Sequence, residues 1–245
     1  MTARRSLALA GAGALLAQWT PAAAAVLPQA ASTLGISTRL PSDRGVLLSF
    51  DDGPHPQGTP AVLEALDRAG VPAVFFVSGE QVARHPGLVR EIASANHEVA
   101  AHGYRHQTRR QWSRALLADD TRRALDTIAT VTCVSPRLYR PPHGVFTVSG
   151  LRLIRALGLE PLLWSKWGRD WRSAATTSTI AADATTRLRA GDVVLLHDAD
   201  HYGADGSWRA TTAALPLIVE RIAAAGLEVA SVRRGYEARE LALTI

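Results

Sequence analysis

The sequence is nearly free of sulfur, with one cysteine and one methionine in 245 residues. A single cysteine, Cys133, excludes an intrachain disulfide and any multi-cysteine zinc or iron–sulfur site, so a bound metal would need histidine and carboxylate ligands. We expect Cys133 to be a buried, inert thiol. The formal net charge of +5 lacks the clustered basic stripe of nucleic-acid-binding proteins, so we expect no nucleic-acid partner. The 47% hydrophobic content excludes a disordered chain.

The N-terminus has the pattern of a targeting segment. Residues 6–27 carry no charge, follow Arg4 and Arg5, and include the small-residue run 22–25. This layout is typical of a secretory signal peptide, and we interpret residues 1–25 as that peptide or as an uncleaved N-terminal membrane anchor. Either interpretation predicts a secreted or otherwise extracytoplasmic protein whose only membrane contact is this segment. Residues 26–43 are interpreted as a connector rich in Pro, Ser and Ala.

From residue 44 to residue 245, short apolar runs alternate with amphipathic stretches of helical length. We predict strands at 46–50, 73–77, 98–101, 137–140, 159–164, 193–197 and 228–232. We predict helices at 59–69, 86–95, 110–130, 147–157, 177–188 and 211–225, several of them opened by a Thr and closed by a Gly. Such alternation predicts one α/β domain with a parallel sheet, either closed into a barrel or doubly wound.

Polar residues at the predicted strand ends favour the barrel. Asp51 and Asp52, His102, Arg140 and His197 each fall at or just past the C-terminal end of a different predicted strand. In a barrel those ends converge on one face, whereas in an open sheet they would spread along an edge. We therefore expect a single-domain barrel with a site at this face.

Two short patterns indicate metal or acid–base chemistry, although neither is decisive alone. His102 and His106 are spaced by one helical turn, which would let both imidazoles reach one metal ion. With eight histidines in the chain, this spacing also arises by chance, and His197 and His201 repeat it. The adjacent Asp51 and Asp52 are costly beside a buried strand unless a cation or a catalytic task uses them. The alternative for them is a plain Asp-Gly-Pro turn.

Five segments follow one another in a recognisable order: residues 49–54 (SFDDGP), 102–106 (HGYRH), 140–144 (RPPHG), 170–171 (DW) and 195–198 (LLHD). They resemble the ordered motifs of the NodB-homology polysaccharide deacetylases, the family 4 carbohydrate esterases. The resemblance extends over residues of about 45–232. It implies a distorted (β/α)7-type barrel and the metal-dependent removal of an acyl group, usually N-acetyl, from a sugar polymer or oligomer.

The resemblance also implies a metal centre. Asp52, His102 and His106 would be its ligands, and two imidazoles with one carboxylate leave open positions for water and substrate, as in catalytic zinc sites. We expect a divalent metal as cofactor, with zinc as the first candidate and Co²⁺ or another divalent ion as alternatives.

Four further matched residues would handle protons. Asp51 would be the general base, oriented and kept ionised by Arg140. His197 would donate a proton to the departing sugar nitrogen, and the Asp170 carboxylate would favour its imidazolium form. An acid and a base are therefore both retained, which indicates an enzyme.

The remaining matched residues would contact substrate. The backbone N–H of His143 would stabilise the oxyanion, and Trp171 and Leu195 would line the pocket for the acyl methyl group. The chain departs from the usual pattern at Gly103, at His143 and at Trp167, where Ser or Thr, Tyr and an acidic residue are common. The departure at Gly103 removes a hydrogen bond that would support the loop, and the one at His143 changes the sugar contacts. The departure at Trp167 puts the tuning of the His197 pKa in question.

The function predicted from sequence is removal of N-acetyl groups from N-acetylglucosamine units of chitin-like or cell-wall polymers. An O-deacetylase of acetylated xylan and a catalytically silent carbohydrate-binding barrel are the alternatives. The expected partner is an acetylated polysaccharide or oligosaccharide, with a monomer as the default assembly. We expect Trp164 to be a packing residue, whereas the polar loop 199–209 is equally well interpreted as a sugar contact or as an ordinary exposed loop.

Overall fold

The computed structural model describes residues 20–25, 27–42, 44–108 and 113–232. Within them, eight strands form one sheet in the order β5-β4-β3-β2-β1-β7-β6, with β8 paired to β1. All pairings between these strands are parallel. The strands are β1 (Gly45–Asp51), β2 (Val74–Val77), β3 (Glu98–Ala101), β4 (Leu138–Tyr139), β5 (Glu160–Pro161), β6 (Lys166–Trp167), β7 (Val193–His197) and β8 (Glu228–Val229).

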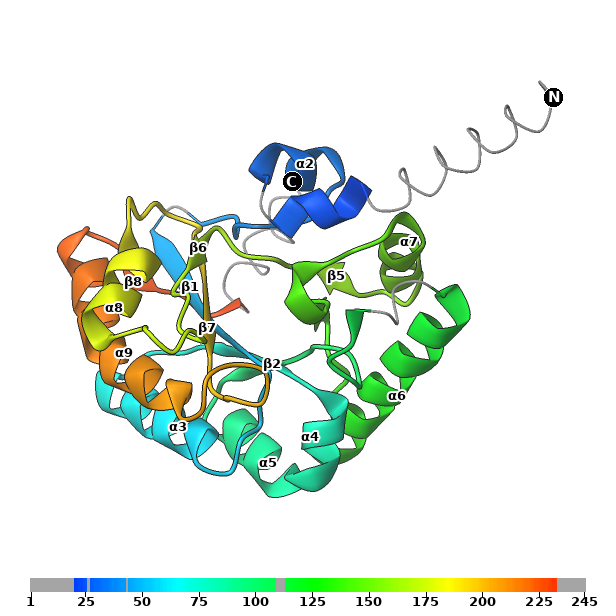
Figure 1. The fold of residues 1–245 in the computed structure, drawn as a ribbon, viewed down its shortest axis with the longest axis horizontal. Coiled ribbons are helices and arrows are strands. Elements are labelled where there is room, and N and C mark those ends of the chain that lie inside the picture. Colours follow the sequence, from blue (N-terminus) through cyan, green and yellow to red (C-terminus); the bar gives the residue numbers. More distant parts are fainter. Residues whose placement is uncertain (1–19, 26, 43, 109–112, 233–245) are drawn as a thin grey trace, which may run out of the picture.

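Helices surround this sheet on its outer side, so the strands and their connecting loops lie inside the ring (Figure 1). They are α3 (Gly58–Ala69), α4 (Gly79–Arg84), α5 (Pro86–Ser94), α6 (Arg114–Thr132), α7 (Val148–Ala156), α8 (Thr177–Thr185) and α9 (Ser207–Ala224). The arrangement confirms the expected single-domain α/β barrel of the distorted (β/α)7 type. The helix α4 has no counterpart in the sequence prediction, and α9 begins four residues before the predicted start.

One predicted strand is wrong. Residues 159–164 do not form a single strand, because β5 pairs with β4 at one edge of the sheet and β6 pairs with β7 at the other. The chain between them crosses the opening of the barrel. Its carbonyl groups at Leu162 and Leu163 accept hydrogen bonds from Arg140, so they are not free to continue a strand ladder.

The predicted connector lies against that opening. Ser37 forms an isolated bridge with Leu162, and Arg39 forms another with Asp192, just before β7. Ile36 and Leu40 are buried. The preceding elements, η1 (Thr20–Ala25) and α2 (Pro28–Thr33), lie on the same side of the barrel (Figure 1).

Most of the predicted N-terminal targeting segment, residues 1–19, lies outside the described residues. Among the helices that the structure does describe, none combines the length and apolar character needed to cross a bilayer.

Side chains alternate along β1, and this alternation positions the site. Val46, Leu48 and Phe50 pack outward against the helices in the larger apolar cluster. Leu47 belongs to a second, inner cluster, and the period of two puts Ser49 and Asp51 on the same inner face. The interior of the barrel therefore changes from apolar to polar toward the C-terminal end of the strand.

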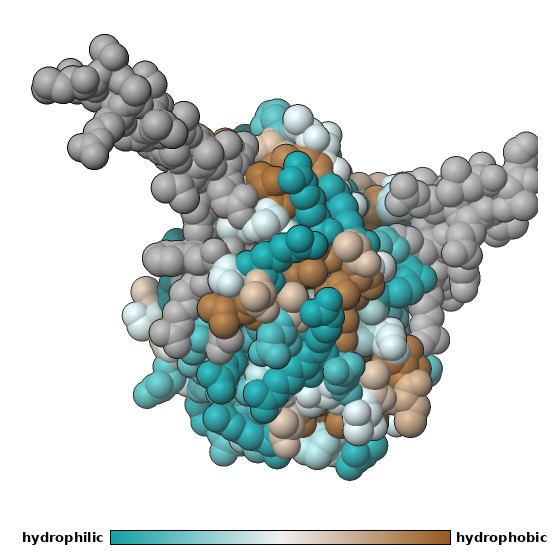
Figure 2. All heavy atoms as spheres, turned by 90° about the vertical axis from the view of Figure 1, so that its right-hand side faces the viewer, coloured by the Kyte–Doolittle hydropathy of each residue, from teal (hydrophilic) through white to brown (hydrophobic). Residues whose placement is uncertain are grey.

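The helix surface is ordinary for a globular protein. Figure 2 shows the side of the molecule near α6 and α7, where hydrophilic residues predominate and apolar ones are interspersed. Cys133 follows α6 as its C-cap with φ of 59° and is exposed. The expectation of a buried thiol is wrong, because the left-handed cap ends the helix in solvent.

Candidate functional site

The predicted site residues do meet at the C-terminal ends of the strands. Asp51 and His197 are the last residues of β1 and β7, which are neighbours in register. His102 directly follows β3 and Arg140 directly follows β4. Because these strands are parallel, their side chains converge on one face of the barrel, as expected.

Asp52, His102 and His106 form a compact group of potential metal ligands. Asp52 Oδ1 lies 3.4 Å from His102 Nε2 and 3.3 Å from His106 Nε2. Ligands bonded at about 2.0–2.2 Å to one tetrahedral zinc ion would lie about 3.3–3.6 Å apart. Asp52 Oδ1 is also buried without a hydrogen-bond partner among the described residues. An orphaned carboxylate oxygen beside two imidazole nitrogens fits a divalent cation well.

The protonation of the two histidines suits this task. His102 Nδ1 lies 2.8 Å from the carbonyl oxygen of Arg140, which can only accept, so Nδ1 carries the hydrogen and Nε2 keeps its lone pair. Burial lowers the pKa of His106 to about 3 despite the opposing charge of Asp52. The ring of His106 is therefore neutral and able to bind a metal at neutral pH.

The local conformation that joins the two histidines differs from the one expected. Residues 102–107 form a loop rather than a helical turn, and Gly103 has φ of 78°. An added Cβ at Gly103 would lie only 3.1 Å from Asp120 Oδ2. Asp120 accepts hydrogen bonds from the backbone N–H groups of Tyr104 and Arg105. This carboxylate therefore anchors the loop directly. It does so beside Gly103, where the family pattern has a Ser or Thr whose side chain could support the loop with a hydrogen bond.

Asp51 is held by Arg140 in the barrel interior. Arg140 Nη1 lies 2.6 Å from Asp51 Oδ1, and the two side chains are 0% and 5% exposed. Arg140 also donates to Ser49 Oγ and to the carbonyls of Leu162 and Leu163. A guanidinium fixed by these partners holds one carboxylate oxygen of Asp51 and leaves the other free toward the site.

His197 and Asp170 form a second buried pair. His197 Nδ1 lies 2.8 Å from Asp170 Oδ1, and the backbone N–H of His197 donates to Asp170 Oδ2. Thr211 also donates to this carboxylate. Burial alone would lower the pKa of His197, but the charge and hydrogen bond of Asp170 outweigh it and raise the pKa to about 10. His197 is therefore protonated at neutral pH, with Nε2 3.8 Å from Asp52 Oδ2.

Burial would raise the pKa of Asp52, but the electrostatic effect of the neighbouring histidines, including the His197 imidazolium, outweighs burial and lowers it overall. Its backbone φ of 79° lies in the left-handed region, which is uncommon for a residue with a side chain.

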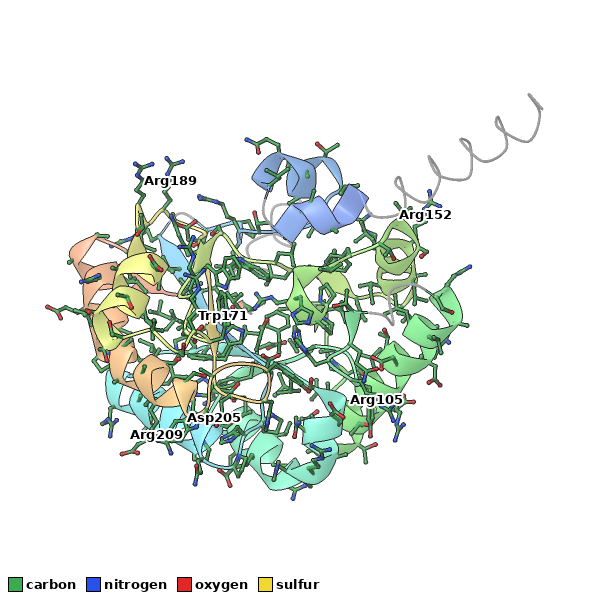
Figure 3. The ribbon with its side chains drawn as sticks, viewed as in Figure 1. Arg105, Arg152, Trp171, Arg189, Asp205 and Arg209 are labelled. Carbon is green, nitrogen blue, oxygen red and sulfur yellow. The ribbon has the colours of Figure 1, made fainter. Side chains whose placement is uncertain are left out.

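A cavity of about 350 Å³ collects these groups. Eight of the ten residues singled out in the sequence line it: Asp51, Asp52, His102, His106, His143, Trp171, Leu195 and His197. Arg140 and Asp170 do not line it, because they are fully buried behind Asp51 and His197. Figure 3 shows Trp171 inside the ring of elements, whereas Arg152 and Arg189 lie at its periphery.

Three aromatic residues also line the cavity without having been assigned there from sequence: Trp164, Trp167 and Tyr202. Tyr202 comes from the loop after β7, stacks on the His106 ring at 4.0 Å, and donates to Glu80 of α4. Its two-point attachment makes it a wall of the cavity. The only sequence signal was an aromatic residue in a polar loop. Trp164 packs against both apolar clusters, as expected, and its half-buried side chain also takes part in the lining.

A second His/Asp group, His55, Asp200 and His201, lies outside this cavity. The backbone N–H groups of Gln57 and Gly58 donate to His55 Nδ1. Nδ1 is therefore unprotonated and the hydrogen sits on Nε2, 3.3 Å from Asp200 Oδ1. A donor nitrogen cannot bind a metal, so this group is a loop-stabilising hydrogen-bond cluster.

Comparison with known proteins gives consistent matches. A family model described as "Polysaccharide deacetylase" matches residues 39–162. A chitooligosaccharide deacetylase of Bradyrhizobium sp. (strain ANU 289) is 37% identical over 156 residues, which are 63% of this chain and 71% of that protein.

Two further similarities extend over more of the chain. The peptidoglycan-N-acetylglucosamine deacetylase PgdA of Listeria monocytogenes serotype 1/2a (strain 10403S) is 28% identical over 80% of this chain and 39% of its own length. A solved structure of a family 4 carbohydrate esterase from Streptomyces lividans, in complex with acetate, is 31% identical with a TM-score of 0.70. That match covers 78% of this chain and 94% of the solved one.

Proposed function

Because the chain belongs to the polysaccharide deacetylase family, we propose that it is a metal-dependent hydrolase that removes N-acetyl groups from N-acetylglucosamine units of a glycan, releasing acetate. One observation carries the proposal. One cavity holds the ligand atoms of Asp52, His102 and His106 together with the Arg140-bound Asp51 and the imidazolium of His197.

Asp52, His102 and His106 hold the metal in this proposal. A bound divalent ion, with zinc as the first candidate, would supply Lewis-acid polarisation and a lowered water pKa. Asp51 accepts the proton of the attacking water through the carboxylate oxygen that Arg140 leaves free. Arg140 orients Asp51 and does not itself reach the reacting atoms.

His197 donates its Nε2 proton to the amine as the C–N bond breaks, and Asp170 holds the opposite nitrogen. A donor that remains protonated at neutral pH is what a poor amine leaving group requires. An O-acetyl ester, whose alcohol departs more easily, makes a smaller demand on it. The tight pairing of His197 with Asp170 therefore favours the N-deacetylase over the O-deacetylase.

The acetyl group fits between the aromatic and apolar parts of the lining. Trp171 stands edge-on to the His197 ring at 5.7 Å, and Leu195 lies on the strand that ends in His197. We assign the acyl methyl group to these two side chains. His143, with φ of 57°, presents its backbone N–H to the developing oxyanion in this assignment.

The test is acetate release by the full chain from N-acetylglucosamine oligomers, peptidoglycan and acetylated xylan. Each substrate is assayed untreated, with a chelator, and with zinc added back, and Asp51→Asn serves as the catalytic control. We expect chelator-sensitive release from the N-acetyl substrates that zinc restores and Asp51→Asn abolishes. Release from xylan alone would favour the O-deacetylase. Binding of glycans without release from any substrate would favour the silent barrel.

Export is part of the proposal, because the uncharged segment that follows Arg4 and Arg5 matches a secretory signal. Mass spectrometry of the protein expressed in its own host tests it. A mature N-terminus near Val26 supports cleavage, an intact N-terminus in the membrane fraction supports the anchor, and an intact chain in the cytoplasm contradicts both.

A further inference from the structure

A second cavity of about 580 Å³ adjoins the catalytic cavity and shares Trp164 and Trp167 with it. It lies at the opening of the barrel, where Thr38 faces β6 and α8 and Ala24 covers one side. Cleavage near Val26 would remove Ala24 and leave the other lining residues in the chain. Its volume is in the range of about 300–1,000 Å³ that is typical of ligand sites. A glycan that leaves the catalytic cavity past these two tryptophans enters this space.

Three tryptophans lead from one cavity to the other. Trp171 stands beside His197 and stacks on Trp167 with ring centroids 4.8 Å apart. Trp167 and Trp164 follow at 5.5 Å. Because Trp171 and Trp167 stack on each other, the faces between them are occupied. A glycan that passes from one cavity to the other therefore contacts the remaining ring surfaces that line the two cavities. Trp167 occupies the position where the sequence departs from the family pattern, so this lining is a feature of the chain itself.

The rim of the second cavity is cationic. Arg39, Lys166 and Arg169 line it together with a single acid, Asp183. The other nearby carboxylate, Asp192, is fully buried beneath the rim, 2.8 Å from Arg39 Nη2 and 3.6 Å from Lys166 Nζ. Three positive charges against two negative ones leave a net charge of about +1 at this place.

Among the described residues, the two arginines leave hydrogen-bond donors unused. Arg39 and Arg169 are 41% and 47% exposed, and a guanidinium has five donors in a planar fork that matches a carboxylate. The ion pair of Arg169 with Asp183 is long, at 3.8 Å, and exposed on both sides, so it is weak and easily exchanged. Lys166 is instead committed to the carbonyl groups of Thr186 and Arg187.

We propose that this second cavity is a subsite for a sugar unit that carries a carboxylate, adjacent to the N-acetylglucosamine unit that loses its acetyl group. The inference rests on the proposed function and narrows its substrate class to acidic glycans. The neighbouring unit contacts the parts of Trp164 and Trp167 that line this cavity, and its carboxylate displaces Asp183 from the Arg169 guanidinium.

Binding is measured first, with the full-length Asp51→Asn protein, so that the result does not depend on turnover. Four tetrasaccharide probes are compared by calorimetry. The neutral probe is chitotetraose. Two probes carry carboxylates from different sources, alternating N-acetylglucosamine with N-acetylmuramic acid or with glucuronic acid. The fourth is the muramic acid probe with its carboxyl groups converted to methyl amides.

We expect about tenfold tighter binding of an acidic probe than of chitotetraose, and loss of most of that gain on amidation. The gain should shrink as salt is raised from 50 to 500 mM, because exposed charges are screened. Tight binding of both acidic probes identifies the carboxylate itself as the recognised group. Preference for one of them identifies its source. Equal affinity for all four probes overturns the proposal.

Arg169→Gln tests whether Arg169 recognises the carboxylate of the substrate, in binding and in turnover. The ratio of kcat/KM for the muramic acid probe to that for chitotetraose should fall about tenfold in this variant. Arg152→Gln removes the same charge from an exposed position of α7 and should leave the ratio at its wild-type value. A ratio that falls equally in both variants reflects net charge alone and contradicts the subsite.

The proposal and the proposed function can fail separately. If the wild-type chain releases acetate from no glycan while Asp51→Asn still binds acidic probes more tightly, the function is wrong and the subsite stands. If acetate is released from neutral and acidic glycans with the same kcat/KM and the same affinity, the function stands and the subsite is wrong.

Discussion

Arg140 Nη1 donates a 2.6 Å hydrogen bond to Asp51 Oδ1 where neither side chain is more than 5% exposed. Each charge depends on the other, because an unpaired ion in the barrel interior would lack solvation. The remaining donors of Arg140 go to Ser49 and to two backbone carbonyls. The same side chain therefore orients the proposed base and holds the segment that crosses the opening of the sheet.

Arg140→Met should lower kcat by about 100-fold or more and the free energy of unfolding by about 3–5 kcal/mol, because it leaves a buried carboxylate unpaired. The measurement is acetate release together with urea unfolding. A double-mutant cycle with Asp51→Asn tests the coupling through stability, because that background has no acetate release to measure. There the Arg140→Met substitution should lower the free energy of unfolding by less than in wild type, because it leaves no buried carboxylate unpaired. An undiminished loss would show that Arg140 is not coupled to Asp51.

Replacement of Asp170 by Asn should move the alkaline limb of the activity profile to lower pH. The pKa of His197 is raised to about 10, chiefly by Asp170 against the effect of burial, so the proposed proton donor is charged throughout the neutral range. Without the carboxylate its pKa falls toward its ordinary value of about 6.5, and activity should decline between about pH 6 and 9. An unchanged profile would contradict the role of the pair.

The stability effect of the same substitution has a defined sign. A histidine whose folded-state pKa is raised contributes stability that is complete below about pH 6.5 and is lost as the pH rises toward 10. The wild-type protein should therefore exceed Asp170→Asn in unfolding free energy most at acidic pH. Asp183→Asn, at an exposed position away from His197, is the matched control and should show no such trend.

Removal of metal gives a further prediction. If Asp52, His102 and His106 bind one divalent ion per chain, zinc at about 1,000 times its Kd should stabilise the fold by about 4 kcal/mol. Elemental analysis and thermal unfolding with and without chelator measure this. His106→Ala should reduce the bound metal and remove the zinc-dependent rise in Tm, whereas His201→Ala should change neither. Equal zinc stabilisation of the His106→Ala and wild-type proteins would place the ion elsewhere.

The sequence predicted the site better than it predicted the backbone around it. The sequence brought Asp51, His102 and His197 to the same place because each ends a strand or directly follows one, and parallel strands bring their C-terminal ends together whatever the loops do. The spacing of His102 and His106 suggested one helical turn, and their assignment as ligands came from the family resemblance, yet both residues lie on a loop. They converge because Gly103 turns the backbone and Asp120 anchors it, a contact between distant segments that no local pattern records.

Two other features depend on contacts between segments far apart in the sequence. The split of residues 159–164 into the end of one strand and a crossing follows from Arg140 capturing two carbonyl groups. Tyr202 reaches the cavity because its hydroxyl group meets Glu80, 122 residues away. Strand propensity and loop polarity carry no information about either contact.

The last prediction concerns Asp198, which follows the proposed acid but faces away from the cavity. Its side chain is fully buried, Thr59 donates to Oδ2, and Oδ1 has no hydrogen-bond partner within the described residues. Burial raises the pKa of this carboxyl to about 7. Between the unfolded value of about 3.8 and 7, the folded state binds more protons, so this group lowers the unfolding free energy as the pH rises through that window.

Asp198→Asn keeps an oxygen for Thr59 and carries no charge at any pH. It should therefore stabilise the protein at pH 8 by about 2 kcal/mol relative to wild type, with the difference shrinking or reversing at pH 5. Urea unfolding at both pH values measures it, and Asp205→Asn, at an exposed loop position, serves as the control. The same difference at pH 5 and pH 8 would mean that Asp198 is ionised in the folded state throughout.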